Sequence, residues 1–165
     1  MSSQPRIEER PAQAYASMHR KVTMATIAEI ADRIPELVGW VLSRGIPMAG
    51  APFLKYDLIA MDGVLEVEAG LPIGGPAEGD DQVRVASLPA GRYASLTHVG
   101  HPDELVGRTA ELLEWAEKSG LSWDADDTGR WACRMEVYKT NPAEEPDPAR
   151  WETELVFKLA DAPPS

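Results

Sequence analysis

The chain has 165 residues, of which 44% are hydrophobic and 26% are charged, and its formal net charge at pH 7 is -11. This composition is typical of a globular domain that is large enough to bury its own core. The negative charge argues against direct binding to nucleic acid or to an anionic membrane, because both depend on positive groups, and the single cysteine excludes an internal disulfide and a cysteine-based metal site.

The first predicted element is a strand that is interrupted by a proline bend, and its sequence occurs twice. Residues 10–17 read Arg-Pro-Ala-Gln-Ala-Tyr-Ala-Ser, and residues 88–95 read Leu-Pro-Ala-Gly-Arg-Tyr-Ala-Ser. Proline lacks a backbone donor, so within a sheet it suits a bulge or an edge. The repeat predicts that the chain consists of two similar halves.

An amphipathic helix follows each of these strands. Apolar residues recur at three- and four-residue spacing across residues 27–41 and again across residues 105–116. Gly45 and Gly120 stand where a left-handed residue would end each helix. Pro35 predicts that the first helix bends or restarts one or two residues earlier.

Two more strands are predicted after the helix in each half. They cover residues 53–60 and 65–73 in the first half, and residues 131–139 and 151–159 in the second. A polar, glycine-rich connector at 74–81 separates the halves, which we place at about 5–75 and 82–160 of a single domain spanning 1–165.

The resulting prediction is an α+β fold made from a duplicated strand-helix-strand-strand unit. Neither half can bury its apolar face alone, so the two should pair into a pseudo-twofold antiparallel sheet with the helices on one face. The other face would then form a concave ligand cleft, because ligand sites favour crevices between repeats.

One strand of the second half combines polar and apolar residues in strict alternation. Arg134, Glu136 and Tyr138 share one face, and residues 133, 135 and 137 share the other. We expect the apolar residues to pack under the helices and the polar ones to line the concave side.

These features together resemble the GyrI-like family, also known as the bacterial transcription-activator effector-binding domain. The resemblance rests on the Pro-Ala-x-x-Tyr strand openings, helices ending in Trp-x-x-x-x-Gly, the segment Met135-Glu136-Val137-Tyr138 and residues 91–105, and it covers about residues 5–160. It implies binding of lipophilic, often cationic, small molecules, with Glu136 at the pocket centre. Because the repeat occupies nearly the whole chain, no helix-turn-helix module and no direct transcriptional regulation are expected.

Glu136 is therefore the candidate centre of a ligand site. A partly desolvated carboxylate favours a cation or a proton, and each aromatic wall adds about 0.5 to 2 kcal/mol of cation–π attraction. A structural salt bridge to Arg134 is the alternative role for Glu136. The candidate ligand-binding residues are Glu136, Tyr138, Arg134, Trp131, Trp123, Tyr56, Phe53 and Asp57.

Two alignments of the first half with the Glu136 strand stay open. Asp57 becomes the counterpart of Glu136 if residues 55–57 align with residues 134–136. An offset of one residue instead puts Tyr56 in the pocket and reverses the face assignment.

Three functions are compatible with the sequence. We favour binding or sequestration of lipophilic, chiefly cationic or aromatic, small molecules. The resemblance also implies a hydrolase of electrophilic cyclopropane-type natural products, in which Glu136 and Tyr138 or Tyr56 would be catalytic. The third is an inhibitor-type module that binds a protein through its acidic surface.

No metal or cofactor is expected. The three histidines lack the spacing of metal ligands, and no phosphate loop, nucleophile elbow or dinucleotide motif is present. No stretch approaches the roughly 20 apolar residues of a membrane span, and residues 1–10 are too polar for a signal peptide. We therefore expect a cytoplasmic protein.

Overall fold

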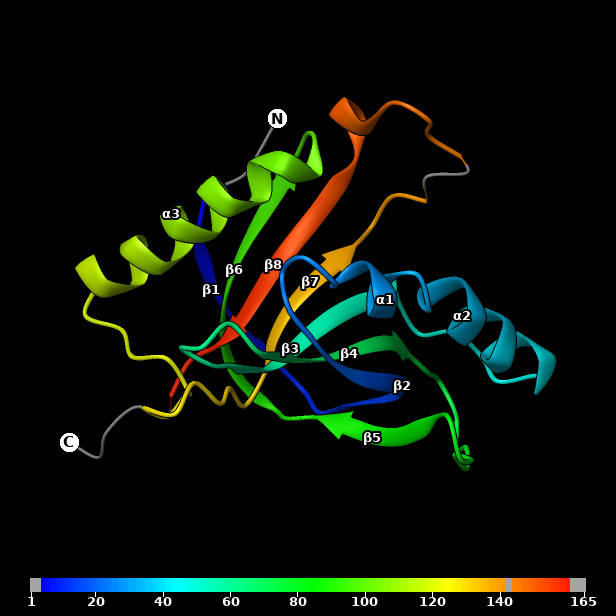
Figure 1. The fold of residues 1–165 in the computed structure, drawn as a ribbon. Coiled ribbons are helices and arrows are strands. Elements are labelled where there is room, and N and C mark those ends of the chain that lie inside the picture. The colour runs from blue at the N-terminus through cyan, green and yellow to red at the C-terminus, as the bar shows by residue number, and fades with distance from the viewer. Residues whose placement is uncertain (1–3, 142–143, 161–165) are drawn as a thin grey trace.

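The computed structural model describes residues 4–141 and 144–160, and within them eight strands form one antiparallel sheet (Figure 1). The order across the sheet is β1-β6-β8-β7-β3-β4-β2-β5. The strands are β1 (Arg6–Arg10), β2 (Gln13–Val22), β3 (Phe53–Ile59), β4 (Leu65–Pro72), β5 (Arg84–Leu88), β6 (Gly91–Val99), β7 (Arg134–Tyr138) and β8 (Glu152–Lys158).

The helices are α1 (Ala28–Ala31), α2 (Ile34–Ser43) and α3 (Leu105–Lys118), with short 3-10 turns η1 (Pro102–Glu104) and η2 (Pro148–Arg150). Pro35 lies in the first turn of α2, where its missing donor costs nothing, so the predicted restart of the helix is confirmed. Gly45 and Gly120 have φ angles of 68° and 74°, as a left-handed helix end requires. The longest helix, α3, has 14 residues, and no described helix is long and apolar enough to cross a membrane.

The duplicated α+β fold is confirmed, and its centre lies where β3 meets β7. There Leu54 pairs with Glu136, and the strand order on one side of this point repeats on the other. The predicted proline bends separate β1 from β2 and β5 from β6. The two halves also exchange their first strands, because β1 pairs with β6 and β5 pairs with β2.

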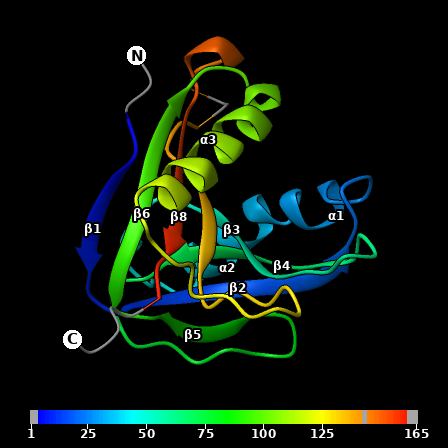
Figure 2. The ribbon, with the colours of Figure 1, turned by 90° about the vertical axis from the view of Figure 1, so that its left-hand side faces the viewer.

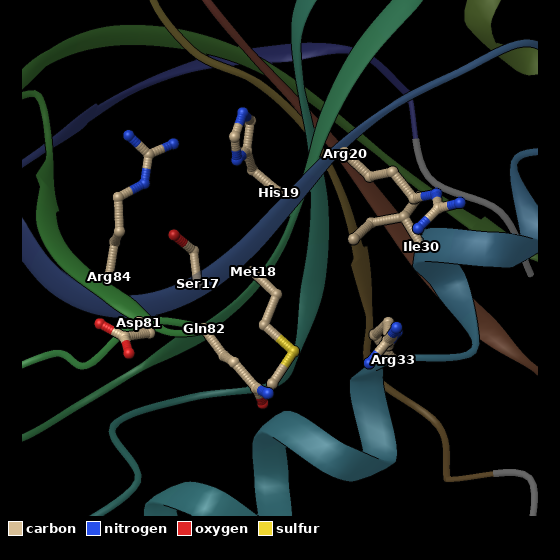
Figure 3. A pocket seen from close by; sticks show the side chains of 9 residues that line it. All are labelled: Ser17, Met18, His19, Arg20, Ile30, Arg33, Asp81, Gln82 and Arg84. Atoms are coloured by element: carbon tan, nitrogen blue, oxygen red, sulfur yellow. The ribbon is translucent and has the colours of Figure 1, made fainter.

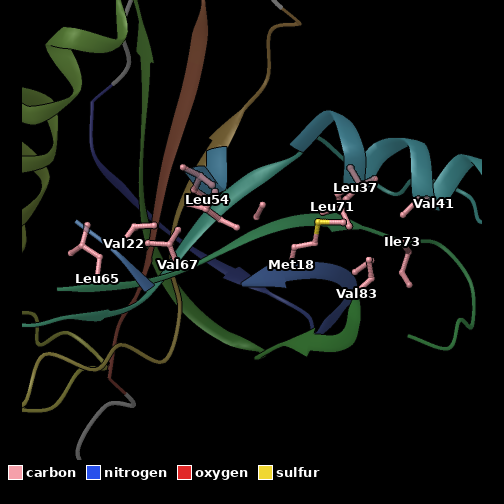
Figure 4. Packing of buried hydrophobic residues seen from close by; sticks show 13 residues of the cluster. Met18, Val22, Leu37, Val41, Leu54, Leu65, Val67, Leu71, Ile73 and Val83 are labelled. Atoms are coloured by element: carbon pink, nitrogen blue, oxygen red, sulfur yellow. The ribbon is translucent and has the colours of Figure 1, made fainter. Parts of the chain in front are cut away.

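All three α-helices cover the same face of the sheet, which we call the helix-bearing face. Helix α3 lies over β6 and β8, and α1 and α2 lie over β2 and β4 (Figures 1 and 2). Leu37 and Val41 of α2 pack with strand residues such as Leu71 and Met18 (Figure 4). Under α3, a separate cluster joins Ala94, Leu96, Leu105, Leu112, Leu155, Phe157 and Leu159.

The opposite face, which we call the helix-free face, buries a third cluster without any helix. It contains Tyr15, Phe53, Leu88, Tyr93, Cys133, Met135, Val137 and Val156. Both faces of the central strands therefore bury side chains, a pattern that strict polar–apolar alternation does not reveal.

The predicted face assignment of β7 is wrong. Arg134 and Glu136 pair with Phe157 and Leu155, which pack under α3, so the polar residues of β7 are on the helix-bearing face. Met135 and Val137 are on the helix-free face instead. Alternation showed that the two faces differ, but it does not show which one the helices cover.

Candidate functional site

Glu136 lies between the cluster under α1 and α2 and the cluster under α3. Its Oε1 accepts hydrogen bonds from the hydroxyls of Tyr56, at 3.0 Å, and Tyr138, at 2.9 Å. Because Leu54 pairs with Glu136 at the centre of the pseudo-twofold arrangement, Tyr56 and Tyr138 are equivalent residues of the two halves. Each half thus supplies one tyrosine to the same carboxylate oxygen.

Both tyrosines remain protonated donors. Burial raises the pKa of Tyr56 and of Tyr138 well above the ordinary value of a phenol, and the nearby charge of Glu136 raises both further. Two neutral hydroxyl groups are therefore directed at Glu136.

Arg134 lies on the same face as Glu136 but makes a different contact. Its guanidinium carbon is 4.5 Å from the ring centre of Phe157 and 4.7 Å from that of Trp131. Burial lowers the pKa of Arg134, and the charge of Glu136 opposes that shift. In the described part of the chain no ion pair within 4.0 Å joins Arg134 to Glu136, so the structure does not contain the alternative salt bridge.

Trp123 and Trp131 extend the site as part of an aromatic group with Phe157. The ring centre of Trp123 lies 5.7 Å from that of Trp131 and 5.8 Å from that of Phe157. Phe157 was not among the residues predicted for the site. The signal for it is the β7–β8 register, which places it opposite Arg134, and that register is not readable from one sequence.

The other two predicted residues, Phe53 and Asp57, lie away from Glu136. Phe53 is buried in the cluster on the helix-free face. Leu54 is the counterpart of Glu136, three residues from Asp57, so the alignment of Asp57 with Glu136 is wrong. Tyr56 is on the same face as Glu136, as the alternative alignment predicts, but its counterpart in β7 is Tyr138 and not Glu136.

Asp57 instead belongs to a buried polar cluster that sequence reasoning missed. Lys55 forms ion pairs with Asp57 and with Glu68, the latter at 3.2 Å, and Tyr15 and Ser17 donate to Glu68 at 3.1 and 2.9 Å. Burial beside Glu68 raises the pKa of Asp57 to about 7. Burial opposes the shift at Glu68, but hydrogen bonds and Lys55 hold its pKa at about 2.

Two hollows lie outside this site. One of about 450 Å³ lies beside β2 and α1, and its lining includes Arg20, Arg33, Arg84 and Asp81 (Figure 3). Another of about 400 Å³ lies on the helix-free face. Neither is lined by Glu136, which is itself partly exposed.

The described residues offer little for metal or thiol chemistry. No group of three or more His, Cys, Asp or Glu side chains among them is placed to hold a metal ion. Cys133 is buried, and burial raises the pKa of its thiol to about 11, which disfavours the reactive thiolate.

Comparison with known proteins gives one family and several solved structures. The profile of the GyrI-like small molecule binding domain matches residues 3–160. None of the curated proteins matches the chain in sequence.

Three of the solved proteins share the fold over nearly all of this chain. The EcmrR C-terminal domain is 19% identical, with a TM-score of 0.78 over 96% of this chain and 98% of that one. In the EcmrR–DNA complex, at 20% identity and a TM-score of 0.80, the same 96% of this chain spans 58% of the EcmrR chain.

The other two are more distant in sequence. A hydrolase encoded by lin2189 from Listeria innocua is 14% identical, with a TM-score of 0.63 over 95% of this chain and 92% of that chain. SAV2435, solved bound to tetraphenylphosphonium, is 9% identical, with a TM-score of 0.62 over 96% and 95%. At these identities the likeness shows a common fold.

Proposed function

Because the chain belongs to the GyrI-like small molecule binding domain family, we propose that its ligand is a lipophilic organic cation held at Glu136. The observation that carries this proposal is the set of partners around the carboxylate. Two phenol hydroxyls bind it, and among the described residues no cationic group lies within 4.0 Å. A cationic ligand would supply the missing counter-charge.

The surroundings of Glu136 favour a lipophilic cation over a small hydrated one. Apolar clusters lie on both sides of the carboxylate, and Tyr56 and Tyr138 flank it on the same face. Apolar groups of the ligand would gain about 25 cal/mol for each Å² removed from water. SAV2435, which shares the fold, is bound to a cation of this class, tetraphenylphosphonium.

Such a ligand would meet Glu136 on the helix-bearing face, beside Tyr56 and Tyr138. Glu136, Tyr56 and Tyr138 are each partly exposed as whole residues, so the described structure does not seal this site from solvent. Rotation of either ring breaks one hydrogen bond to Glu136, whose net worth is about 0.5 to 1.5 kcal/mol. The electrostatic gain from a cation near the carboxylate exceeds this cost.

A second candidate function is hydrolysis of an electrophilic ring at the same carboxylate. It is favoured by the direct hydrogen bonds between Glu136 and two protonated tyrosines. Glu136 would accept a proton from the attacking water, and one tyrosine would donate a proton to the ligand oxygen that gains negative charge. The Listeria innocua hydrolase shares the fold.

The test is a tryptophan-fluorescence titration with tetraphenylphosphonium, because Trp123 and Trp131 lie beside the site. At about 5 Å and an effective dielectric constant near 20, a unit charge pair is worth about 3 kcal/mol. We therefore expect Glu136→Gln to weaken binding about 10- to 100-fold.

The matched control is Glu117→Gln, which removes the same charge from the exposed surface of α3. We expect it to change affinity less than twofold. Equal affinity of wild type and Glu136→Gln would refute the proposal. The mass of each cyclopropane-bearing compound is measured after incubation with the protein. A gain of one water by the compound, seen only when Glu136 is intact, would support the hydrolase.

A further inference from the structure

The helix-free face carries a hollow that the Glu136 site does not use. Its volume is about 400 Å³, within the range of small-molecule pockets. Its floor is largely apolar, with Phe53, Met135 and Val137 at the junction of β3 and β7. Glu136 points away from this hollow, because residues on either side of it in β7 face the hollow.

One buried acid, Glu154 of β8, lines the hollow. Its side chain is only 6% exposed. Oε1 accepts a hydrogen bond from Arg10, at 3.1 Å, and lies 3.6 Å from Nζ of Lys139. Oε2 accepts no hydrogen bond from the described residues, yet it is not sealed from open space. A largely buried carboxylate oxygen that accepts no hydrogen bond from the protein favours a hydrogen-bond donor from a bound molecule.

The equivalent place in the first half of the chain is filled. Glu68 corresponds to Glu154 and Lys55 to Val137, because each acid pairs with that residue across the ladder. Lys55 reaches Glu68 at 3.2 Å, and the hydroxyl of Tyr15 donates to it at 3.1 Å. Both oxygens of Glu68 are therefore satisfied by the protein itself.

The second half lacks these partners. Val137 is too short to reach Glu154, and it leaves empty the space that its counterpart Lys55 fills in the first half. Tyr93, the counterpart of Tyr15, donates its hydroxyl to the carbonyl of Pro89 instead of to the acid. The hollow and the unpartnered oxygen thus arise from the same departure from the internal repeat.

We infer that this hollow is a second small-molecule site, for an uncharged aromatic molecule whose hydroxyl donates to Oε2 of Glu154. The charges nearby already balance, since Arg10 is also paired with Glu8 at 2.7 Å and Lys139 with Glu154. A further cation or anion would disturb that balance, whereas a neutral hydroxyl supplies the missing donor. The apolar floor selects an aromatic body. This inference does not depend on the proposal for Glu136.

The test is calorimetric binding of 2-naphthol, with 2-methoxynaphthalene as the matched probe that lacks a donor. We expect 2-naphthol to bind at least about tenfold more tightly, as a hydrogen bond to a charged group implies. Val137→Lys, which imitates Lys55, should fill the hollow and reduce 2-naphthol affinity at least tenfold. Glu117→Gln, on the exposed surface of α3, should leave that affinity unchanged.

Chemical-shift mapping of 2-naphthol on the wild-type protein decides the matter even if Val137→Lys does not fold. The inference predicts the largest shifts at Gly50, Lys139 and Glu154, which line the hollow. Equal binding of the two probes, shifts centred on Tyr56 and Trp131, or undiminished 2-naphthol binding by folded Val137→Lys would each overturn it.

Discussion

Replacement of Lys55 by methionine should destabilise the protein, because it removes the positive charge that pairs with Asp57 and Glu68 in the buried cluster. The Lys55 side chain is 10% exposed, and its Nζ lies 3.2 Å from Glu68. At an effective dielectric constant near 20, this one contact has a gross Coulomb energy of about 5 kcal/mol. Part of it is offset because the variant no longer buries an ammonium group, so we expect a net loss of about 3 kcal/mol at pH 8.

The loss should depend on pH. The pKa of Asp57 is about 7, so at pH 5 this carboxyl is protonated and Lys55 neutralises one charge instead of two. Tyr15 and Ser17 still donate to Glu68 in the variant. We therefore expect the cost of Lys55→Met to fall to about 1 to 2 kcal/mol at pH 5.

Urea denaturation at pH 5 and pH 8 measures both values. Lys118→Met is the matched control, because Lys118 is 75% exposed and pairs with Glu114 on the surface of α3. Such exposed pairs contribute about 0.3 to 0.5 kcal/mol, so the control should change little at either pH. A loss below about 1 kcal/mol for Lys55→Met at pH 8, or the same loss at both pH values, would refute this reasoning.

Three further substitutions test other contacts of the structure. The pKa of Asp57 is about 7 in the folded protein, above its ordinary value of 3.8. Folding therefore takes up a proton between these two pH values, and wild-type stability falls as the pH rises from about 4 to 7. Asp57→Asn should remove this pH dependence, as measured by urea denaturation. The Arg134→Gln variant should bind tetraphenylphosphonium about three- to tenfold more tightly, because the change uncovers the rings of Trp131 and Phe157 and removes a positive charge near Glu136. Weaker binding in the fluorescence titration would contradict this. Gly70→Ala places a methyl group against the ring of Phe53 and should lower the free energy of unfolding by about 2 to 3 kcal/mol, whereas a loss below 0.5 kcal/mol would show that the ring moves freely.

Local patterns in the sequence were sufficient for most of the elements. The doubled Pro-Ala-x-x-Tyr segments, the helical spacing and Pro35 predicted strands, helices and a helix restart that the structure contains. The exchange of β1 and β5 between the halves was not predictable in this way. It depends on which strand forms the edge beside β6 or β2, and no short-range pattern records that choice.

The site was predictable in composition but not in orientation. Glu136, Tyr138 and Tyr56 do come together, and the first two share a strand face by simple alternation. That this face lies under the helices depends on which apolar residues of β8 meet α3, a long-range contact. The Lys55–Glu68 pair was missed for the same reason, because it forms only in the β3–β4 register.

The most direct test of a cation site at Glu136 is a crystal structure of the protein with tetraphenylarsonium, whose arsenic is located by anomalous scattering. The account predicts one arsenic peak on the helix-bearing face, within about 6 Å of the Glu136 carboxylate and beside the rings of Tyr56 and Tyr138. A peak in the hollow on the helix-free face, with the Glu136 hydrogen bonds intact, would contradict it.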